Sequence, residues 1–464
     1  MTRRRMGLMA AVVAMLTISA FGDVTKLISD TKDKVGALAR FYCTMQDEMG
    51  VRTLEGQAVC ITADPAVFIT LGLNARVPPG SFNNFVLVPA NAPDKTIKAE
   101  LLGVDPETNI AFLRATEPYA WGVVQFAPKA GLTVGQPVAS IGLLGREMNY
   151  QPYVGVGYVS AILGLPDNLD YVTGGKLTVP GSPVFNADGR AVGLVGSQQF
   201  LDYQMAMGSR MTTLSMRGQD ETAFFMPVDE FAHVLVNIPA SPAQVRRLPW
   251  IGVLNFSGIS KEVADIMKLQ GAGVMVEGVI PDGPAAKAGL ADRDVILAVN
   301  GEKFPVAANP DTAALALQRK LYRMTIGSKV TLTVKRGDTT KDYEVSLAAL
   351  PQLPYEAKRY LNMAMGFLVR EKIDLDRYMD KSLAANVPGL LVLAADGPAA
   401  SAGLHEGDLI TTVNNTPVTT TAGLKDAVEA SAKGGKPVVI VVRRGEQTQT
   451  ITIQPQATQP TGGK

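Results

Sequence analysis

An eight-residue pattern occurs twice in the C-terminal half of this chain and constrains its fold more than any other feature. Residues 283–290 read GPAAKAGL and residues 397–404 read GPAASAGL. At the same spacing Asp294 recurs as Asp408, and each copy ends in two strand-like segments joined by an Arg-Gly turn. The coincidence of spacing, turn residues and strand pattern predicts two copies of one small α+β module.

Both copies resemble PDZ domains of the kind that bacterial proteases carry, over residues 249–349 and 356–455. A PDZ domain binds an extended peptide as an added strand, and backbone N–H groups of a glycine-containing loop hold the peptide carboxylate. The resemblance predicts helices over 311–322 and 421–432 as the opposite wall of each groove. It assigns peptide binding to Trp250, Ile251, Gly252 and Val253 in the first module and to Met365, Gly366, Phe367 and Leu368 in the second.

A second interpretation of these modules stays open. In it, one or both grooves are degenerate and the modules act only as spacers. The second module favours this interpretation more than the first does, because residues 370–386 form an extra segment after its loop.

The N-terminal half has the pattern of a β-barrel protein. From about residue 41 to residue 237, short apolar strands alternate with Gly, Pro and Asp turns. Residues 176–195, KLTVPGSPVFNADGRAVGLV, resemble the nucleophile segment of trypsin-like serine proteases of the HtrA/DegP family, in which a Gly-Asn-Ser-Gly-Gly-Pro run precedes a hydrophobic strand. The resemblance predicts a mostly β protein, with a trypsin-like double β-barrel domain followed by two α+β PDZ domains.

All three catalytic positions of that family carry other residues in this sequence. A Ser-His-Asp site needs a nucleophilic hydroxyl, an imidazole that takes its proton, and a carboxylate that orients the imidazole. The resemblance places Leu73 at the histidine position, Asn109 at the aspartate position and Pro180 at the serine position. Proline has neither a hydroxyl nor a backbone N–H. We therefore expect a degenerate catalytic site.

The number of histidines leads to the same expectation without an alignment. The chain has only two, His233 in a predicted helix and His405 in the second module, and we expect both to be ordinary surface residues. Ser182 is an alternative nucleophile, with Lys176 as its base. The competing interpretation makes Ser182 a turn serine that precedes Pro183.

Composition restricts the partners and the cofactors. Lys and Arg number 44 and Asp and Glu number 43, and the net charge of +1 argues against nucleic acid or an anionic membrane surface as the main partner. The two cysteines, Cys43 and Cys60, either form a disulfide or are separately buried thiols. Because two Cys and two His lie far apart along the chain, we expect no metal site and no cofactor.

The first 22 residues have the pattern of a signal peptide. A run of arginines precedes an apolar segment that ends in Ala-Phe-Gly, and the alternative is an uncleaved membrane anchor. We therefore expect an exported, periplasmic protein. Its predicted parts are a signal peptide (1–22), a degenerate protease domain (23–238), a linker (239–248), the two modules and a polar tail (456–464).

These features together predict an exported HtrA-like pseudoprotease whose PDZ domains bind C-termini or extended segments of unfolded envelope proteins. Such a protein would act as a chaperone, an adaptor or a regulatory subunit. Two alternatives remain, an active serine endopeptidase with a rearranged site and a structural oligomeric scaffold. The resemblance also implies a homotrimer or a hetero-oligomer with active paralogues.

Overall fold

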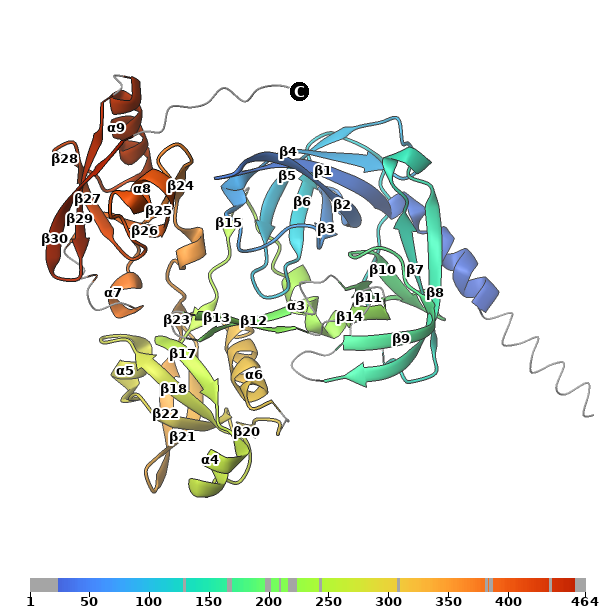
Figure 1. The fold of residues 1–464 in the computed structure, drawn as a ribbon. Helices are drawn as coiled ribbons and strands as arrows, with labels where there is room; N and C mark the ends of the chain where they lie inside the picture. The colour runs from blue at the N-terminus through green and yellow to red at the C-terminus, as the bar shows by residue number, and fades with distance from the viewer. Residues whose placement is uncertain are drawn as a thin grey trace, which may run out of the picture.

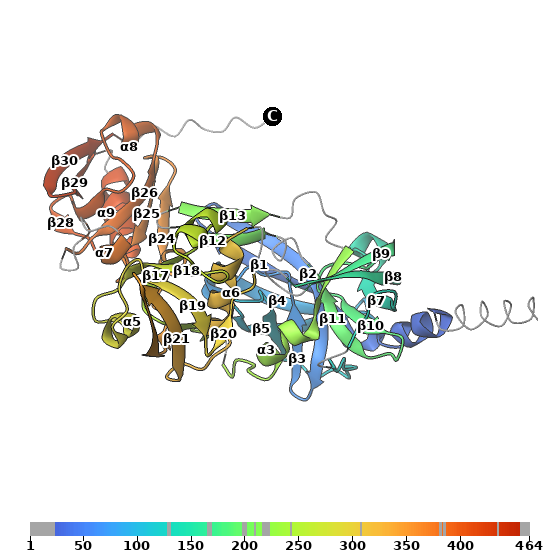
Figure 2. The same ribbon diagram turned by 90° about the horizontal axis from the view of Figure 1, so that it is seen from below.

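The computed structural model describes residues 24–127, 131–164, 169–196, 202–207, 210–215, 223–241, 244–306, 309–379, 383, 387–433 and 436–454. The predicted signal peptide and polar tail therefore lie outside the described residues. In these ranges no helix is both long enough and apolar enough to cross a membrane. In both views the N-terminal helix, residues 24–32, and the second C-terminal module lie at opposite ends of the molecule (Figure 1 and Figure 2).

The first barrel is a six-stranded sheet that closes on itself. Its strands follow the order β5-β4-β1-β2-β3-β6, and pairing between β5 and β6 completes the circle. Phe41, Phe68 and Phe112 are fully buried among its apolar side chains, and this burial is the main force that holds the strands together. The strands are β1 (Leu38–Asp47), β2 (Gly50–Ala63), β3 (Ala66–Thr70), β4 (Phe82–Pro89), β5 (Ile97–Val104) and β6 (Ala111–Ala115).

The second barrel is also closed, in the order β10-β11-β14-β9-β8-β7. Its core includes Val184, Val192 and Phe225, which are fully buried. The nucleophile-like segment forms the antiparallel hairpin β10–β11, as its turn residues predicted. The strands are β7 (Pro137–Leu143), β8 (Pro152–Leu163), β9 (Leu169–Lys176), β10 (Pro183–Asn186), β11 (Ala191–Val195) and β14 (Phe224–Pro227).

Short elements connect the barrels to one another and to the modules. A hairpin, β12–β13, leaves the second barrel and forms a two-stranded sheet by itself, and β12 passes within 8 Å of β17 in the first module. After β14 the chain turns through α3 and then adds β15 in parallel to β5. These elements are η1 (Val35–Ala37), η2 (Pro79–Ser81), η3 (Arg146–Met148), β12 (Asp202–Met207), β13 (Arg210–Ser215), η5 (Val228–Glu230), α3 (Ala232–Leu235) and β15 (Gln244–Val245).

The first module is a sheet in the order β17-β18-β19-β21-β22, with α6 packed against β17. The chain enters through β16, which pairs with β23 at the end of the module and not with β17. The elements are β16 (Pro249–Trp250), β17 (Val253–Gly258), α4 (Lys261–Ile266), β18 (Val274–Val279), α5 (Pro284–Ala288), β19 (Val295–Val299), β20 (Glu302–Lys303), α6 (Asp311–Tyr322), β21 (Lys329–Arg336), β22 (Thr339–Ser346) and β23 (Ala348–Ala349).

The second module repeats this sheet as β25-β26-β27-β29-β30, with α9 in the place of α6. It differs at its entry, where β24 pairs with the outer edge of β25. The elements are η6 (Pro354–Glu356), β24 (Arg359–Asn362), β25 (Phe367–Glu371), α7 (Asp376–Met379), β26 (Leu390–Ala395), α8 (Gly397–Ser401), β27 (Leu409–Val413), β28 (Thr416–Pro417), α9 (Thr421–Lys433), β29 (Val438–Arg444) and β30 (Gln447–Ile453).

The repeated aspartates form the same ion pair in both modules, between a buried carboxylate and a partly exposed arginine. Asp294 accepts hydrogen bonds of 2.6 and 2.7 Å from Arg336, and Asp408 accepts two of 2.7 Å from Arg444. Both carboxylates are about 1% exposed. The sequence repeat therefore encodes one folding unit twice, and each unit has its own apolar core.

The extra segment of the second module packs against the first module. Ile373 and Leu375, both buried, form a cluster with Ile280, and Trp250 and Leu254 pack at its edge. The two modules are thus joined by apolar contact.

The helix predicted over 311–322 is confirmed to the residue as α6, and the helix predicted over 421–432 is α9. The N-terminal helix ends before the apolar run from Leu38, which belongs to β1. Sequence patterns did not predict β9 or the hairpin β12–β13. Both cysteines are buried and free, which agrees with the separate-thiol interpretation. Burial raises the pKa of Cys43 to about 11 and that of Cys60 to about 12, so both thiols stay protonated.

Candidate functional site

A trypsin-like site would lie where the two barrels meet, and Gln57 bridges this contact. Its side-chain amide donates to Ile141 O (3.0 Å) and to Ser182 Oγ (2.9 Å), and its Oε1 accepts from Leu143 N (2.9 Å). Gln57 belongs to β2 of the first barrel, whereas Ile141 and Leu143 belong to β7 of the second. A buried and fully bonded glutamine thus joins the two barrels. No sequence pattern indicated this role.

The three residues predicted to occupy the catalytic positions lie near this contact between the barrels. Asn109, in a left-handed backbone conformation (φ 56°), accepts at Oδ1 from the backbone N of Ala75 (3.1 Å), two residues beyond the buried Leu73. Gly181 follows Pro180, and a Cβ on it would lie 3.5 Å from the backbone N of Leu71. Leu73, Asn109 and Pro180 therefore lie in one region of the fold, and their assignment to the catalytic positions stays a prediction.

The backbone of the nucleophile segment makes its hydrogen bonds with other residues of the barrel domain. In trypsin-like sites the oxyanion hole uses the N–H of the nucleophile and that of the residue two positions earlier. Here the first position is Pro180, which has no N–H. The second is Thr178, whose N–H donates to the buried Ser140 Oγ at 2.8 Å. Neither position offers a donor to a substrate in this conformation.

Ser182 lies in the same segment and is 0% exposed. Its Oγ accepts a hydrogen bond from Gln57, and its backbone N–H donates to Val179 O at 3.1 Å. Lys176, the base considered for it, is exposed. This environment fits a structural serine at the barrel interface better than a nucleophile, which needs access to substrate and a nearby base.

The two histidines lie in different environments. The expectation that His233 is an ordinary surface residue is wrong, because its side chain is 25% exposed and its Nε2 lies 3.1 Å from Glu107 Oε2. His405 is exposed, as expected.

Glu107 belongs to a charged cluster that ties the first module to the barrels. Arg323, just after α6, donates from Nε to Glu107 (3.0 Å) and from Nη2 to Glu230 (2.7 Å). Arg319 of α6 lies 3.5 Å from the same Glu230 oxygen. The glutamate side chains are 2% and 5% exposed, so the interaction is screened little by water. We call Glu107, Glu230, His233, Arg319 and Arg323 the interdomain clasp.

The loop of the first module has the backbone of a carboxylate-binding loop. Gly252 has φ 85°, and a Cβ on it would come within 2.7 Å of Pro284, so glycine is required. The repeated GPAA segment positions the loop, since Ala285 N donates to Ile251 O at 2.7 Å. Trp250 Nε1 donates to Val253 O at 2.8 Å. Among the described residues, no acceptor bonds the N–H groups of Ile251 and Gly252.

The loop of the second module has the same backbone but different partners. Gly366 has φ 74°, and a Cβ on it would lie 2.1 Å from Asp396 O. Ala399 N donates to Met365 O at 2.8 Å, as Ala285 does to Ile251 in the first module. The loop N–H groups, however, are bonded by the side chain and the backbone of Asn362.

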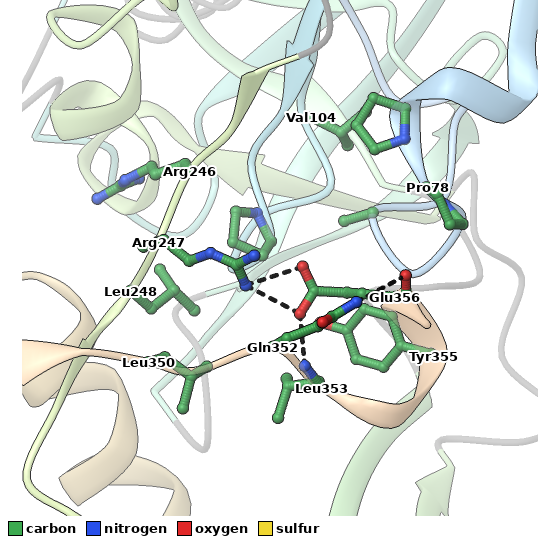
Figure 3. A pocket seen from close by; sticks show the side chains of 13 residues that line it. Pro78, Val104, Arg246, Arg247, Leu248, Leu350, Gln352, Leu353, Tyr355 and Glu356 are labelled. Carbon is green, nitrogen blue, oxygen red and sulfur yellow. Dashed lines mark hydrogen bonds and ion pairs between the residues drawn. The ribbon is translucent and has the colours of Figure 1, made fainter. Parts of the chain in front are cut away.

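A small cavity of about 160 Å³ lies where the first barrel, the linker and the segment between the modules meet. Arg247 and Glu356 cross it with two hydrogen bonds of 2.9 Å, as the dashed lines in Figure 3 show. Glu356 also accepts from Leu353 N at 2.6 Å. The polar groups in the cavity bond one another, so it serves as a structural junction between domains.

Comparison with known proteins agrees with this architecture. Residues 61–194 match the family described as trypsin-like peptidase domain, and residues 254–347 and 377–454 match the PDZ domain family. The "Probable periplasmic serine endoprotease DegP-like" of Pseudomonas fluorescens is 29% identical over 385 residues, which are 78% of this chain and 74% of that protein. Its namesake from Bartonella henselae is 27% identical over 384 residues, covering 77% and 67%.

Solved structures give the same fold. The HtrA-type protease AlgW with a tripeptide has a TM-score of 0.51 and 21% identity, covering 70% of this chain and 98% of that one. The same protease with a decapeptide has a TM-score of 0.50 and the same identity and coverage.

Two closed barrels with a trypsin-like segment, followed by two PDZ modules, define a trypsin-like peptidase fold joined to PDZ domains. The trypsin-like peptidase domain, the PDZ domains and the DegP-like relatives together support the HtrA/DegP family. PDZ domains are in general peptide-binding domains, and the DegP-like relatives are named as periplasmic proteins.

Proposed function

We propose that this chain is a pseudoprotease of the HtrA type that binds the C-termini or extended segments of unfolded envelope proteins. It acts as a chaperone, an adaptor or a regulatory subunit beside active paralogues. A cleaved signal peptide over residues 1–22 brings it to the periplasm. One contrast carries the proposal. In the nucleophile segment the Thr178 N–H and the Ser182 hydroxyl are bonded to other residues of the barrels, whereas the N–H groups of Ile251 and Gly252 in the first PDZ loop are available to a ligand.

Loss of catalysis is supported at each step of the chemistry. No histidine lies at the triad position, since Leu73 occupies it and the other two histidines of the chain are in α3 and in the second module. Pro180 has no hydroxyl, and Thr178 donates its N–H to Ser140. Proton abstraction, nucleophilic attack and oxyanion stabilisation each lack a group.

Peptide binding is supported by the first module. The edge of β17 has no backbone pairing partner among the described strands, and α6 forms the opposite wall. A peptide that adds to this edge would place its carboxylate at Ile251 and Gly252, where backbone N–H groups supply the hydrogen bonds. Asp311 Oδ1 accepts from Gly258 N at 3.1 Å and fixes the far end of the groove.

Trp250 provides a direct test of binding by the mature chain. Its indole bonds Val253 O, a carbonyl beside the proposed site, so ligand binding should change its fluorescence. We expect a response to a pool of randomised decapeptides with free carboxylates and none to the same pool amidated. Trp250→Phe identifies the source of the signal, since the chain has only one other tryptophan, Trp121. If the fluorescence does not respond and the protein also retains none of the peptides, peptide binding is refuted.

A second measurement tests the loss of catalysis. The mature chain is incubated with a chemically unfolded reporter protein and, in parallel, with a serine-reactive phosphonate probe. We expect neither cleavage nor labelling. Cleavage that disappears in Ser182→Ala would instead establish the rearranged endopeptidase.

A further inference from the structure

The two PDZ modules differ at the position where a peptide ligand would lie. In the first module β17 is the outer strand of the sheet, and the preceding strand β16 pairs elsewhere, with β23. In the second module the corresponding strand β25 is covered by β24. The first family match begins at residue 254 but the second only at residue 377, so β24 and β25 lie where this module departs from the family pattern.

We propose that β24, residues Arg359–Asn362, occupies the peptide groove of the second module as a latch strand, so that peptide binding is confined to the first module until the latch withdraws. This inference rests on the proposed function. It identifies which of the two grooves accepts a ligand and what closes the other.

The direction and register of the latch strand are those of a bound peptide. It pairs antiparallel with β25, from Arg359 opposite Arg370 to Asn362 opposite Phe367. Its C-terminal end therefore lies at the carboxylate-binding loop, as the end of a peptide ligand would. Helix α9, the far wall of the groove, lies within 8 Å of both β24 and β25.

Asn362 makes the hydrogen bonds that a ligand carboxylate would make. Its side-chain Oδ1 accepts from Met365 N at 3.0 Å, and its backbone O accepts from Gly366 N at 2.8 Å. Two oxygens of one residue thus satisfy two consecutive N–H groups of the loop. The equivalent groups of the first module, on Ile251 and Gly252, bond no acceptor among the described residues.

Tyr360 packs where a ligand side chain would lie. It packs against the core of the second module, with its ring centroid 6.1 Å from that of Phe367. Its hydroxyl accepts from Asn362 Nδ2 at 3.0 Å, which leaves Oδ1 directed at the loop. Burial raises the pKa of this hydroxyl. The latch strand is therefore held by a side chain in the groove and by an acceptor at the loop.

The latch strand also contacts the barrel domain. Arg359 Nε lies 3.8 Å from Glu48 Oε1, between β1 and β2 of the first barrel. Rearrangement of the domains would therefore act on the latch strand directly.

Amide hydrogen exchange on the full mature chain tests the latch without any ligand. In the wild type we expect the amides of Met365 and Gly366 to exchange at least about tenfold more slowly than those of Ile251 and Gly252, relative to intrinsic rates. Asn362→Ala should remove most of the protection of Met365, and Tyr360→Phe, which keeps the ring, should remove part of it. Met363→Ala is the matched control, since Met363 is 76% exposed in the intervening turn. Equal exchange in the two wild-type loops would overturn the proposal.

Photo-crosslinking shows which groove binds. The probe is a pool of randomised decapeptides with a free carboxylate and one benzophenone residue, and the products are mapped by mass spectrometry. We expect crosslinks in the wild type near β17 and α6 only, and additional crosslinks near β25 and α9 in Tyr360→Ser/Asn362→Ala. Unchanged exchange in β29 and β30 verifies that the double variant is folded. If the double variant is not folded, the single variant Asn362→Ala is used in its place.

The two proposals fail in different ways. Crosslinks to β25 or α9 in the wild type would overturn the latch and leave peptide binding intact. Absence of crosslinks at both modules would count against peptide binding, while the exchange rates of Met365 and Gly366 would still decide whether the latch exists.

Discussion

The two PDZ modules have the same interior but differ in the strand that enters them. Each buries one aspartate against one arginine, and each holds its loop carbonyl with the N–H of an alanine in the repeated GPAA segment. In the first module the entering strand pairs with the last strand, and in the second it folds back onto the groove. A repeat can therefore conserve the folding unit while the few residues before it decide whether the groove is open.

The largest expected effect tests the shared interior. Asp294→Ala removes the buried carboxylate that bonds Arg336 and also accepts from Ala291 N. Asp408→Ala removes the same interactions with Arg444 and His405 N. We expect each variant to destabilise its own module by about 3 kcal/mol. Amide hydrogen exchange, followed separately in each module, would measure this destabilisation. A strong effect of only one of the two substitutions would show that the aspartates do not play the same role in the two modules.

The next effect tests the interdomain clasp, which connects the first module to the barrels. Glu230→Gln removes a buried charge from the interdomain clasp, and Arg319 and Arg323 lose their shared acceptor. We expect the contact between the first module and the barrels to weaken by about 2 kcal/mol. Small-angle scattering and exchange in α6 would report the detachment. Glu344→Gln, which breaks an exposed pair with Lys329, is the control and should change neither.

The clasp should also respond to acid. Burial by itself would raise the pKa of Glu107, but the His233 hydrogen bond and the charges of Arg323 and Arg319 lower it overall. Because the pKa is lower in the folded than in the unfolded protein, this stabilisation is present above about pH 4.3 and is lost as pH falls through the folded value. We expect the first module to lose stability progressively as the pH falls below about 4.3, the pKa of an unperturbed glutamate. Glu107→Gln should abolish this step, and an unchanged pH profile would contradict the assignment.

The smallest expected effect concerns the contact of the second module with the barrel. Arg359 and Glu48 are partly exposed and 3.8 Å apart. We expect Arg359→Gln to cost about 0.5 kcal/mol or less, because water screens such pairs. Thermal unfolding with module-resolved exchange would measure it. A larger loss would mean that the latch strand depends on the barrel domain.

The fold was accessible from the sequence because its signals are local. The GPAA repeat, the alternating strands and the turn residues of the nucleophile segment each act over a few residues, and the structure has the predicted barrels and modules. Leu73, Asn109 and Pro180 were assigned to the catalytic positions through the resemblance to the HtrA/DegP family, and this assignment stays a prediction.

The residues that complete the candidate sites were not accessible in this way. Gln57 of β2 bonds Ser182, and Ser140 of β7 bonds the backbone of Thr178 after β9; no spacing rule connects these residues. Glu107 and Arg323 are joined across a domain boundary. The hairpin β12–β13 and strand β9 also lack clear alternation, so no strand was predicted for them.

The sequence by itself determined which modules this protein contains, because local residue patterns encode the trypsin-like domain and the PDZ repeat. Tertiary structure alone decided which groove is open. Trp250 and Asn362 both precede a Φ-Gly-Φ loop, but Trp250 bonds a loop carbonyl, Val253 O, whereas Asn362 accepts from the loop N–H groups of Met365 and Gly366. That choice depends on which strand edge is free to pair when the chain enters each module, and strand pairing is a property of the assembled sheet.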